Sequence, residues 1–428
     1  MKLIINNKIF TDSTKELDKN SFFVLSKQNE KFLDQARAIT NNIIEDKSLK
    51  DFVDFSSIKI IGITGTNGKT TTAAAIYSIL LDLGYKVALQ GTRGFFINDR
   101  QIEEYSLTTP VQLGNFVNIQ KAILEKCDFF VMEVSSHAIE QKRVEGLDFA
   151  LKIHTNITRD HLDYHKTIEE YIKIKNSFLS DESLKLINID DKIVRFNPKN
   201  AFTYSLDAKG DYKVDAYSFK KAMHIIFSHK NQNYDFSALM MGIFNIYNLM
   251  AAISAVHILT NKNLEEICET LENFGGVSGR MEIISVDPLV IVDFAHTPDG
   301  MDEVLKSFPQ KDIICVFGAG GNRDREKRPL MAKVAARYSK HTIITSDNPR
   351  FEEPEKIVED ILKGLPKTAS FEVEINRKEA IKKALLKADE NSVVLILGKG
   401  DEATQIIYDQ KLPFSDKEEV LKLLTSKN

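Results

Sequence analysis

The stretch from Ile60 to Thr72, IIGITGTNGKTTT, decides how this chain folds. It joins an apolar, β-branched strand to a turn that opens a helix at Gly68-Lys69-Thr70. Such a turn directs backbone N–H groups and a helix N-terminus at a phosphate, with the lysine on the outer phosphates and the threonine on Mg²⁺. The strict pattern has glycine where Ile63 stands, so the sequence predicts a variant phosphate loop that binds a nucleoside triphosphate. The residues expected to contact the nucleotide here are Gly65, Thr66, Asn67, Gly68, Lys69, Thr70 and Thr71.

Strand and helix patterns alternate on both sides of this loop. After residue 57 the apolar runs KVALQG, FFVMEV, LKIHTNI and LKLINI follow it, which predicts a mostly parallel sheet covered by helices. Residues 201–239 predict an antiparallel insert, followed by helices over 248–260 and 263–274. Beyond the glycine-rich joint at 274–280 the rhythm restarts with PLVIVDFA, DIICVFGAG, HTIITSD, FEVEI and SVVLILGKG. We therefore expect an α/β protein of three domains: 1–57, a central P-loop ATPase-like domain over 58–278, and a Rossmann-like domain over 279–428.

Composition narrows the class of protein. The chain has 428 residues, 43% hydrophobic and 28% charged, and a net charge of −4 gives no reason to expect nucleic-acid binding. The opening MKLIINNKIF lacks the features of a signal peptide. We expect no apolar run that approaches the eighteen or so residues of a membrane span. We expect a cytoplasmic monomer without a membrane partner. Cys127, Cys268 and Cys315 have no metal-binding spacing and predict small buried side chains.

Acidic and imidazole side chains follow two of the predicted strands. Glu133 ends FFVMEV, where a Mg²⁺–triphosphate needs an oxygen ligand, although an ordinary strand-end carboxylate has the same appearance. Asp160 and His161 follow LKIHTNI, and we expect them at the same edge of the sheet. Lys175, within the helical pattern YIKIKNSF, has the pattern of a solvated surface lysine.

Taken together and in order, the motifs of this chain resemble the Mur ligases, and most closely those that add diaminopimelate. The motifs are TGTNGKTT, Thr108-Thr109-Pro110, EVSSHAIEQKRV, TNITRDHLDYH, YIKIK, GIFNIYN, SGRMEII, VDFAHTPDGM, FGAGGNRDREKRP, SDNPR and GKGDE. The resemblance covers residues 11 to 402 and implies a uridine-nucleotide-binding N-terminal domain. It also implies an ATP-dependent ligase that joins meso-diaminopimelate to UDP-N-acetylmuramoyl-L-alanyl-D-glutamate in peptidoglycan synthesis, through an acyl phosphate.

The resemblance further implies roles for single residues. Lys69, Glu133, His161 and Lys175 would be catalytic, with Thr70 and Glu133 on one Mg²⁺ and His161 and an N6-carboxylated Lys175 on a second. ATP would also contact Asn245, Arg280, Asp293 and His296. The muramoyl-dipeptide would contact Ser13, Thr108, Thr109, Ser135, Gln141 and Arg143. The amino-acid pocket would comprise Arg323, Asp347, Asn348, Pro349, Arg350, Gly398 and Glu402.

The chain departs from the family pattern at its N-terminal part, which is short, and at three positions. Thr14, Asn322 and Asp401 stand where arginine, aspartate and histidine are usual. We expect changed local hydrogen bonding there and retained function. Lysine addition, or another Mur-type step, stays open as an alternative to diaminopimelate addition. A P-loop switch ATPase is remote because it needs no second Rossmann-like domain, and a nicotinamide enzyme is disfavoured because VFGAGGNRD lacks the dinucleotide fingerprint.

Overall fold

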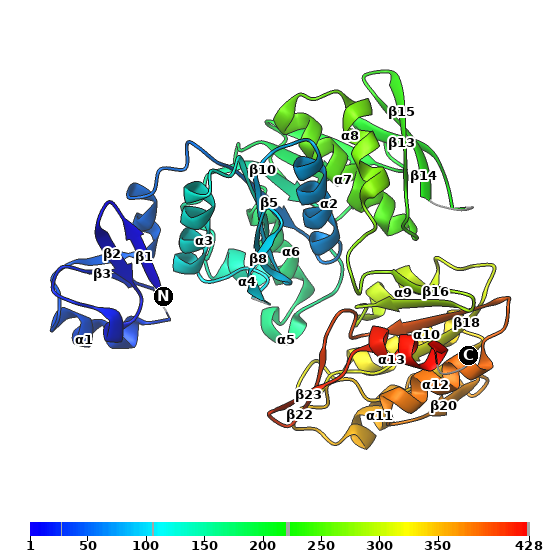
Figure 1. Cartoon of the computed structure of the whole chain (residues 1–428). Coiled ribbons are helices and arrows are strands. Elements are labelled where there is room, and N and C mark those ends of the chain that lie inside the picture. The colour runs from blue at the N-terminus through cyan, green and yellow to red at the C-terminus, as the bar shows by residue number, and fades with distance from the viewer. Residues whose placement is uncertain (27, 105–106, 220–222, 426–428) are drawn as a thin grey trace.

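The computed structural model describes residues 1–26, 28–104, 107–219 and 223–425. Three sheet-containing parts follow one another along the chain, from the blue N-terminal part at the left of Figure 1 to the yellow and red C-terminal part at the lower right. Their sheets contain four, eleven and six strands, and a separate two-stranded ribbon completes the C-terminal part. The predicted α/β fold with a mostly parallel central sheet and a Rossmann-like C-terminal domain is confirmed.

The N-terminal part is a small sheet in the order β1-β2-β3-β4. Asn6 and Asn7 have positive φ angles of 48° and 62°, as a tight hairpin turn between β1 and β2 requires. Phe10 and Phe22 pack with ring centroids 4.9 Å apart, and Phe52 closes the cluster. Its elements are β1 (Lys2–Ile5), β2 (Lys8–Thr11), η1 (Thr14–Glu16), β3 (Phe22–Leu25), η2 (Glu30–Phe32), α1 (Leu33–Arg37), β4 (Ile43–Glu45) and η3 (Asp46–Asp51).

The central sheet is built around β5, which pairs in parallel with β10 on one side and β9 on the other. Five of the six β5 residues are buried, as expected of a parallel strand covered on both faces. Each segment that leaves the carboxyl end of β5, β9 or β10 therefore emerges at one edge of the sheet. The elements up to β11 are β5 (Lys59–Thr64), α2 (Lys69–Asp82), β6 (Val87–Gly91), β7 (Gly94–Ile97), β8 (Arg100–Glu104), α3 (Gln112–Leu124), β9 (Phe129–Glu133), α4 (Ser136–Glu140), β10 (Phe149–His154), α5 (Leu162–His165), α6 (Ile168–Ser177) and β11 (Lys185–Asn188).

The region predicted as an antiparallel insert is antiparallel only in part. β12 (Ala201–Ser205) pairs in parallel with β11, and β13 (Tyr212–Ser218) pairs in parallel with β12. β14 (Met223–His229) and β15 (Gln232–Ala238) then add antiparallel strands and complete the eleven-stranded sheet. The strands extend the central sheet because their apolar side chains, including Tyr204 and Tyr212, join the same buried core as helix α7. The prediction of a wholly antiparallel insert is therefore wrong for β12.

Helix α7 (Ile243–Thr260) begins five residues before the predicted helix, directly after Gly242 at φ +91°. By length and composition alone α7 could cross a membrane, so the expectation that no apolar run approaches this length overlooked it. Of its 18 residues, 61% are buried inside the protein, which is the pattern of a core helix. Helix α8 (Leu264–Thr270) and η4 (Leu271–Asn273) follow.

The C-terminal sheet has the order β16-β17-β21-β18-β19-β20 and contains all five predicted strands, each paired in parallel. An antiparallel edge strand, β16, was not predicted. Apolar residues of α9, α10 and α11 cover one face of this sheet, and those of α12 and α13 cover the other. Its elements are β16 (Glu282–Val286), β17 (Leu289–Asp293), α9 (Pro298–Leu305), β18 (Asp312–Phe317), α10 (Lys327–Tyr338), β19 (His341–Ile344), α11 (Pro354–Leu362), β20 (Phe371–Val373), α12 (Arg377–Lys387), β21 (Ser392–Leu397), β22 (Thr404–Ile407), β23 (Gln410–Pro413) and α13 (Asp416–Thr425).

Candidate active site

The loop between β5 and α2 has the geometry of a phosphate cradle. Gly68, the residue before α2, has φ +85°, a conformation that L side chains rarely adopt. A Cβ atom at this position would lie 2.2 Å from Asn248 Oδ1, so glycine is required for both conformation and space. The Lys69 ammonium donates to the carbonyl oxygens of Gly65 at 2.7 Å and Thr66 at 2.9 Å. Burial lowers the pKa of Lys69, a cation held inside the loop at the place where phosphate charge is expected.

Thr70 and Glu133, the pair expected to bind one Mg²⁺, are in direct contact. Thr70 Oγ1 donates to Glu133 Oε2 at 3.0 Å, and the carboxylate is only 2% exposed. The backbone N–H of Thr92 donates to the other carboxylate oxygen at 3.0 Å. A Cβ atom at Gly91 would lie 2.2 Å from Glu133 Oε1, so this carboxylate sits tightly against β6. Two oxygen ligands thus meet beside the start of the phosphate loop.

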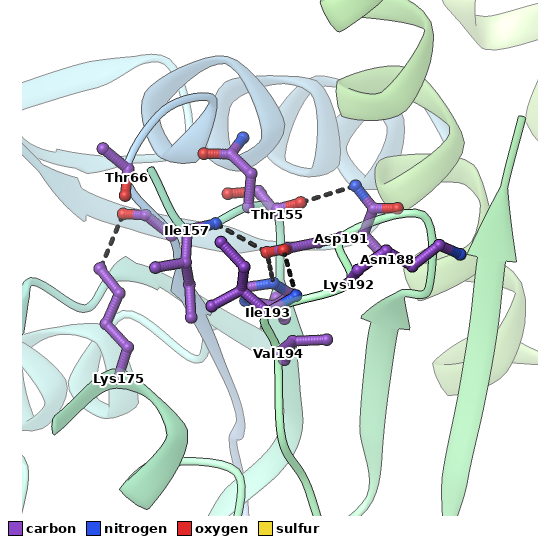
Figure 2. Close-up of polar contacts among 12 residues, drawn as sticks. Thr66, Thr155, Ile157, Lys175, Asn188, Asp191, Lys192, Ile193 and Val194 are labelled. Carbon is purple, nitrogen blue, oxygen red and sulfur yellow. Dashed lines mark hydrogen bonds and ion pairs between the residues drawn. The ribbon is translucent and has the colours of Figure 1, made fainter. Parts of the chain in front are cut away.

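Lys175 is a buried residue of the site and not the surface lysine that its helical pattern indicates. Its side chain is 1% exposed, and Nζ donates to the Gly65 carbonyl oxygen at 2.9 Å, a contact visible at the left of Figure 2. Burial, and then the positive charge of Lys69, lower the pKa of Lys175 well below its ordinary value. Both effects favour the neutral amine over the ammonium.

The segment after β10 carries Asp160 and His161 into the site. Asp191 anchors the start of this segment, because its carboxylate accepts from the Ile157 N–H at 2.7 Å and lies 2.9 Å from His154 Nε2 (Figure 2). Burial acts to raise the pKa of Asp160, but the facing His161, His296 and Lys69 outweigh it and lower that pKa. His161 has a left-handed backbone, with φ 53°, and desolvation lowers its pKa to about 4.

The nucleotide-binding residues predicted on the C-terminal side cluster around Phe294. The Arg280 guanidinium lies 4.2 Å from the Phe294 ring centroid, and His296 Nδ1 lies 3.0 Å from the Phe294 carbonyl oxygen. Asp293 accepts backbone N–H groups on both carboxylate oxygens, and burial raises its pKa although Arg280 opposes the shift. Asn245 approaches from α7 and accepts from Asn248, the residue packed on Gly68.

Most residues predicted to hold the muramoyl-dipeptide form one hydrogen-bonded group. Thr109 Oγ1 donates to the Glu133 carbonyl oxygen and accepts from the Ser135 N–H at 3.0 Å. Arg143 donates to the Thr109 carbonyl oxygen at 2.8 Å and to Gln141 Oε1 at 2.6 Å. Thr108 Oγ1 lies 3.0 Å from Thr92 Oγ1 and so connects this group to the Glu133 contacts. Ser13 lies between β2 and η1 in the N-terminal part and does not line the main cleft.

The residues of the predicted amino-acid pocket follow β18, β19 and β21. Arg350 Nη1 donates to the Gly321 carbonyl oxygen at 3.0 Å, and Asn348 Nδ2 donates to Glu402 Oε2 at 2.8 Å. Asp347 Oδ1 accepts from the Asn348 N–H at 2.6 Å. Burial, followed by repulsion from Arg323, lowers the pKa of Arg350. The carboxylates of Asp347 and Glu402 oppose this shift, so groups of both charges face the same pocket.

A cleft of about 580 Å³ lies between the central and C-terminal domains and brings these groups together. Residues of the predicted sites that line it are Thr108, Thr109, Ser135, Arg143, His161, His296, Arg323, Asp347, Asn348, Arg350, Gly398 and Glu402. The residues of the predicted sites that do not line it are the phosphate-loop residues with Glu133, Lys175, Asn245, Arg280, Asp293, Ser13, Gln141 and Pro349.

Several residues of the site were missed in the sequence. Lys327 lines the cleft from α10; burial lowers its pKa and the facing Asp160 opposes this. The His137 ring packs edge-to-face with the His161 ring, 5.0 Å between centroids, and also lines the cleft. Lys399 is fully buried beneath the amino-acid pocket. All three lie within motifs quoted above, His137 in EVSSHAIEQKRV, Lys327 in FGAGGNRDREKRP and Lys399 in GKGDE, but no role was assigned to them.

The three departures from the family pattern have local explanations. Asn322 has φ 53°, which asparagine tolerates better than most residues, and its Oδ1 accepts from the Phe351 N–H at 3.1 Å. Asp401 forms an ion pair with Arg93 of the central domain, with 3.1 Å between Nε and Oδ2. Thr14 Oγ1 donates to Gln35 Oε1 at 3.1 Å within the N-terminal part. Asn322 and Thr14 thus make local hydrogen bonds, and Asp401 makes an ion pair.

Comparisons with known proteins agree with this geometry. The models of the Mur ligase middle domain and the Mur ligase, glutamate ligase domain match residues 63–256 and 279–400. The chain is 51% identical to a UDP-N-acetylmuramoyl-L-alanyl-D-glutamate–2,6-diaminopimelate ligase of Wolinella succinogenes, covering 97% of this chain and 96% of that protein. It is 49% identical to the ligase of the same name from Helicobacter pylori, covering 96% and 93%. A solved structure of a ligase with that name is 29% identical, with a TM-score of 0.70 over 98% of this chain and 94% of the other. The chain belongs to the Mur ligase family of enzymes.

Proposed function

We propose that this enzyme uses ATP to add meso-diaminopimelate to UDP-N-acetylmuramoyl-L-alanyl-D-glutamate in peptidoglycan synthesis. The cleft between two domains is the observation that carries the proposal. Its central-domain wall has polar groups such as Thr108, Ser135 and Arg143, which suit a nucleotide-activated acceptor. Its C-terminal wall presents Arg323, Arg350 and Glu402, which suit a zwitterionic amino acid. The relatives from Wolinella succinogenes and Helicobacter pylori are named for this reaction.

The proposed reaction has two steps. An oxygen of the D-glutamate carboxylate attacks the γ-phosphorus of ATP, the bond to the bridging oxygen breaks, and ADP leaves. The amine of the amino acid then attacks the carbonyl carbon of the acyl phosphate, loses a proton and expels inorganic phosphate. In the first step Lys69, fixed inside the phosphate loop, offsets charge that builds up on the transferring group. The loop N–H groups of residues 65–71 bind the phosphates, while Asn245, Arg280, Asp293 and His296 bind the rest of ATP.

The side chains present fit magnesium ions. Thr70 and Glu133 already place two oxygens together at 3.0 Å, and His161 with a modified Lys175 would supply the second pair of ligands. Mg²⁺ held there would neutralise charge on phosphate and acyl oxygens. No cluster of three or more His, Cys, Asp or Glu side chains suited to a metal occurs among the described residues. Phosphate oxygens and water would therefore complete each coordination shell, as is usual for Mg²⁺.

Lys175 meets the chemical requirement for carboxylation. The reaction with carbon dioxide needs a neutral amine, and burial next to Lys69 favours that form. The product is an anion that would attract Lys69, so modification changes a repulsive lysine pair into an attractive one. The same anion supplies oxygen atoms for a metal ion where an amine supplies none suitable.

The substrates would occupy opposite walls. Thr108, Thr109, Ser135 and Arg143 would hold the muramoyl-dipeptide, with Ser13 and Gln141 toward the uridine end; Gln28 of the N-terminal part donates to Gln141 Oε1 at 3.4 Å. Arg350, helped by Arg323, would pair with the far carboxylate of diaminopimelate, and Glu402 with Asn348 would take its ammonium. Lysine lacks that carboxylate, so its binding would desolvate Arg350 without a partner. Asp347, Pro349 and Gly398 would shape the pocket.

The domain organisation completes the proposal. We place boundaries after residues 57 and 278, because residues 274–280 connect the two larger sheets and the N-terminal sheet ends before β5. Closure of the C-terminal domain on the central domain would assemble the site from both walls. We expect the enzyme to act as a cytoplasmic monomer on small-molecule substrates.

The test measures phosphate release with ATP, the muramoyl-dipeptide and each candidate amino acid, then both amino acids in competition, with products separated by mass. We expect diaminopimelate to be incorporated in preference to lysine by a factor of about 10⁴. Arg350→Ala should lose most of this preference. Comparable incorporation of lysine by the wild-type enzyme, or a preference for diaminopimelate that survives in Arg350→Ala, would contradict the proposed specificity.

A further inference from the structure

The floor of the amino-acid pocket contains a lysine that is hidden from solvent. The Lys399 side chain is 0% exposed, and its Nζ donates to Glu402 Oε2 at 2.9 Å, to Asn348 Oδ1 at 3.2 Å and to the Thr404 carbonyl oxygen at 2.7 Å. A buried ammonium is stable only when such partners satisfy it. Its three hydrogens therefore tie together three segments: GKGDE, the DNPR turn and strand β22.

These contacts fix the orientation of both polar side chains above it. Asn348 Oδ1 accepts from Lys399 and from the Ile406 N–H at 2.9 Å, so the Asn348 amide hydrogens must point the other way, toward Glu402. Glu402 Oε2 accepts hydrogen bonds from both Lys399 Nζ and Asn348 Nδ2. Glu402 Oε1 has no donor among the described residues and belongs to a side chain that is 37% exposed and lines the cleft. One carboxylate oxygen is anchored, and the other is left for a ligand.

The same anchor affects the arginine beside it. Glu402 lies near enough to Arg350 to influence its pKa, yet Arg350 donates to the carbonyl oxygens of Gly321 and Asn348. A Glu402 carboxylate released from Lys399 would gain most by turning toward Arg350, the nearby cation exposed to the cleft. That contact would occupy the ammonium-binding oxygen and the carboxylate-binding guanidinium at once.

We propose that Lys399 is a positioning residue that sets amino-acid specificity by holding Glu402 apart from Arg350. The inference rests on the proposed function, because it assigns the pocket to an amino acid with a charged group of each sign at its far end. Lys399 touches no substrate. It keeps one acidic and one basic recognition group unpaired with each other until the substrate ammonium and carboxylate arrive.

The test is Lys399→Met, which keeps most of the side-chain length and removes the charge. We expect the KM for diaminopimelate to rise at least about tenfold, with the KM values for ATP and the muramoyl-dipeptide within about twofold of the unmodified enzyme. Preference for diaminopimelate over lysine should fall at least about tenfold. Activity at saturating diaminopimelate should be affected much less than KM.

Lys185→Met is the matched control. Lys185 is also 0% exposed, and its Nζ donates to three backbone carbonyl oxygens, those of Asp181, Ser183 and Lys199, in the central domain away from the cleft. Its loss should lower the thermal midpoint without changing the KM for diaminopimelate or the preference. A Lys399→Met enzyme with the same pattern as Lys185→Met would overturn the proposal.

A double-mutant cycle gives the second measurement. If Lys399 acts through Glu402, Lys399→Met added to Glu402→Ala should raise the KM far less than it does alone. Fully multiplicative losses would contradict the proposal. Should Lys399→Met fail to fold, Lys399→Arg keeps the charge but moves the donors, and a selective rise in the KM for diaminopimelate is again expected. If the unmodified enzyme shows no turnover that depends on diaminopimelate, the proposed function itself fails, which is a different result.

Discussion

At the scale of single residues, Lys69 is held where charge accumulates during phosphoryl transfer. Its ammonium is fixed by two carbonyl oxygens of its own loop, so it needs no rearrangement when ATP binds. Lys69→Ala should therefore lower turnover at least about a hundredfold, the usual effect of losing a preorganised charge stabiliser. The measurement is ADP formation at saturating substrates, with thermal unfolding as a check of folding. Turnover close to that of the unmodified enzyme would remove the phosphate-loop assignment.

The second prediction at the scale of single residues concerns Lys175 and the anion that its proposed carboxylation would create. Lys175→Ala should be nearly inactive, with turnover lower by about two orders of magnitude or more. A small added carboxylate such as acetate should restore part of the activity, because it can enter the space that the buried side chain vacates. The same carboxylate should not rescue Lys69→Ala, which lacks a cation. An intact mass that shows an unmodified Lys175 amine in the active, Mg²⁺-loaded enzyme would argue against the carboxylated form.

At the scale of secondary-structure elements, strand β13 and helix α7 are joined by a buried polar contact. Tyr212 OH lies 2.7 Å from His257 Nδ1, the His229 ring packs 5.2 Å from the His257 ring, and Lys230 is nearby. Burial, with these positive neighbours, lowers the pKa of His257 from 6.5 to about 4. The unfolded chain therefore binds a proton that the folded protein resists, and stability falls as pH decreases from about 6.5 toward 4.

His257→Gln should reduce this loss of stability at acidic pH while keeping a hydrogen-bond acceptor for Tyr212. The partial exposure of the ring reduces the expected contribution to about 1–2 kcal/mol. Urea unfolding from pH 7.5 to pH 4.5 gives the measurement, with His224→Gln, on the neighbouring strand β14 and 45% exposed, as the control. Equal pH slopes for the unmodified enzyme and His257→Gln would contradict the assigned cause.

The elements also show how far sequence reasoning reaches. Four of the five parallel strands of the C-terminal sheet were predicted because buried parallel strands are rich in apolar residues, and the fifth, β20, was predicted from the alternating FEVEI although it is largely exposed. Strands β16, β22 and β23 were not predicted because they are short and none of their residues is fully buried, so no pattern distinguishes them from loops. Lys175 looked exposed, although Tyr171 one helical turn earlier is buried on the same face of α6. Arg93 gave no signal because only tertiary folding brings it to Asp401, and His137 lies within EVSSHAIEQKRV but was assigned no role.

At the scale of the whole molecule, the Arg93–Asp401 ion pair bridges the central and C-terminal domains. Because the two side chains are 40% and 16% exposed, the pair should contribute only about 0.5–1 kcal/mol, and less at high salt. Arg93→Ala should therefore raise the KM for ATP about two- to fivefold and make it less sensitive to salt. The exchanged pair, Arg93→Asp with Asp401→Arg, should recover part of the loss.

Arg100→Ala is the control for that experiment. It breaks a pair of similar length with Glu125, 3.1 Å apart, but within the central domain. Kinetic constants of Arg100→Ala should match those of the unmodified enzyme. If Arg93→Ala and Arg100→Ala behave alike at every salt concentration, the cross-domain pair has no part in closure.

The two-walled cleft has one more consequence, for inhibition. Of the two molecules that the proposed reaction joins, each contacts mainly one domain, whereas the joined product contacts both domains and holds them together until it is released. A stable phosphinate inhibitor that joins groups for both walls would bind the second wall at a high effective concentration once the first is bound. Its affinity would therefore exceed that of an inhibitor that contacts either wall alone. The affinity of such an inhibitor should fall with any substitution that changes the glycine-rich joint at 274–280, even when both walls of the cleft are intact.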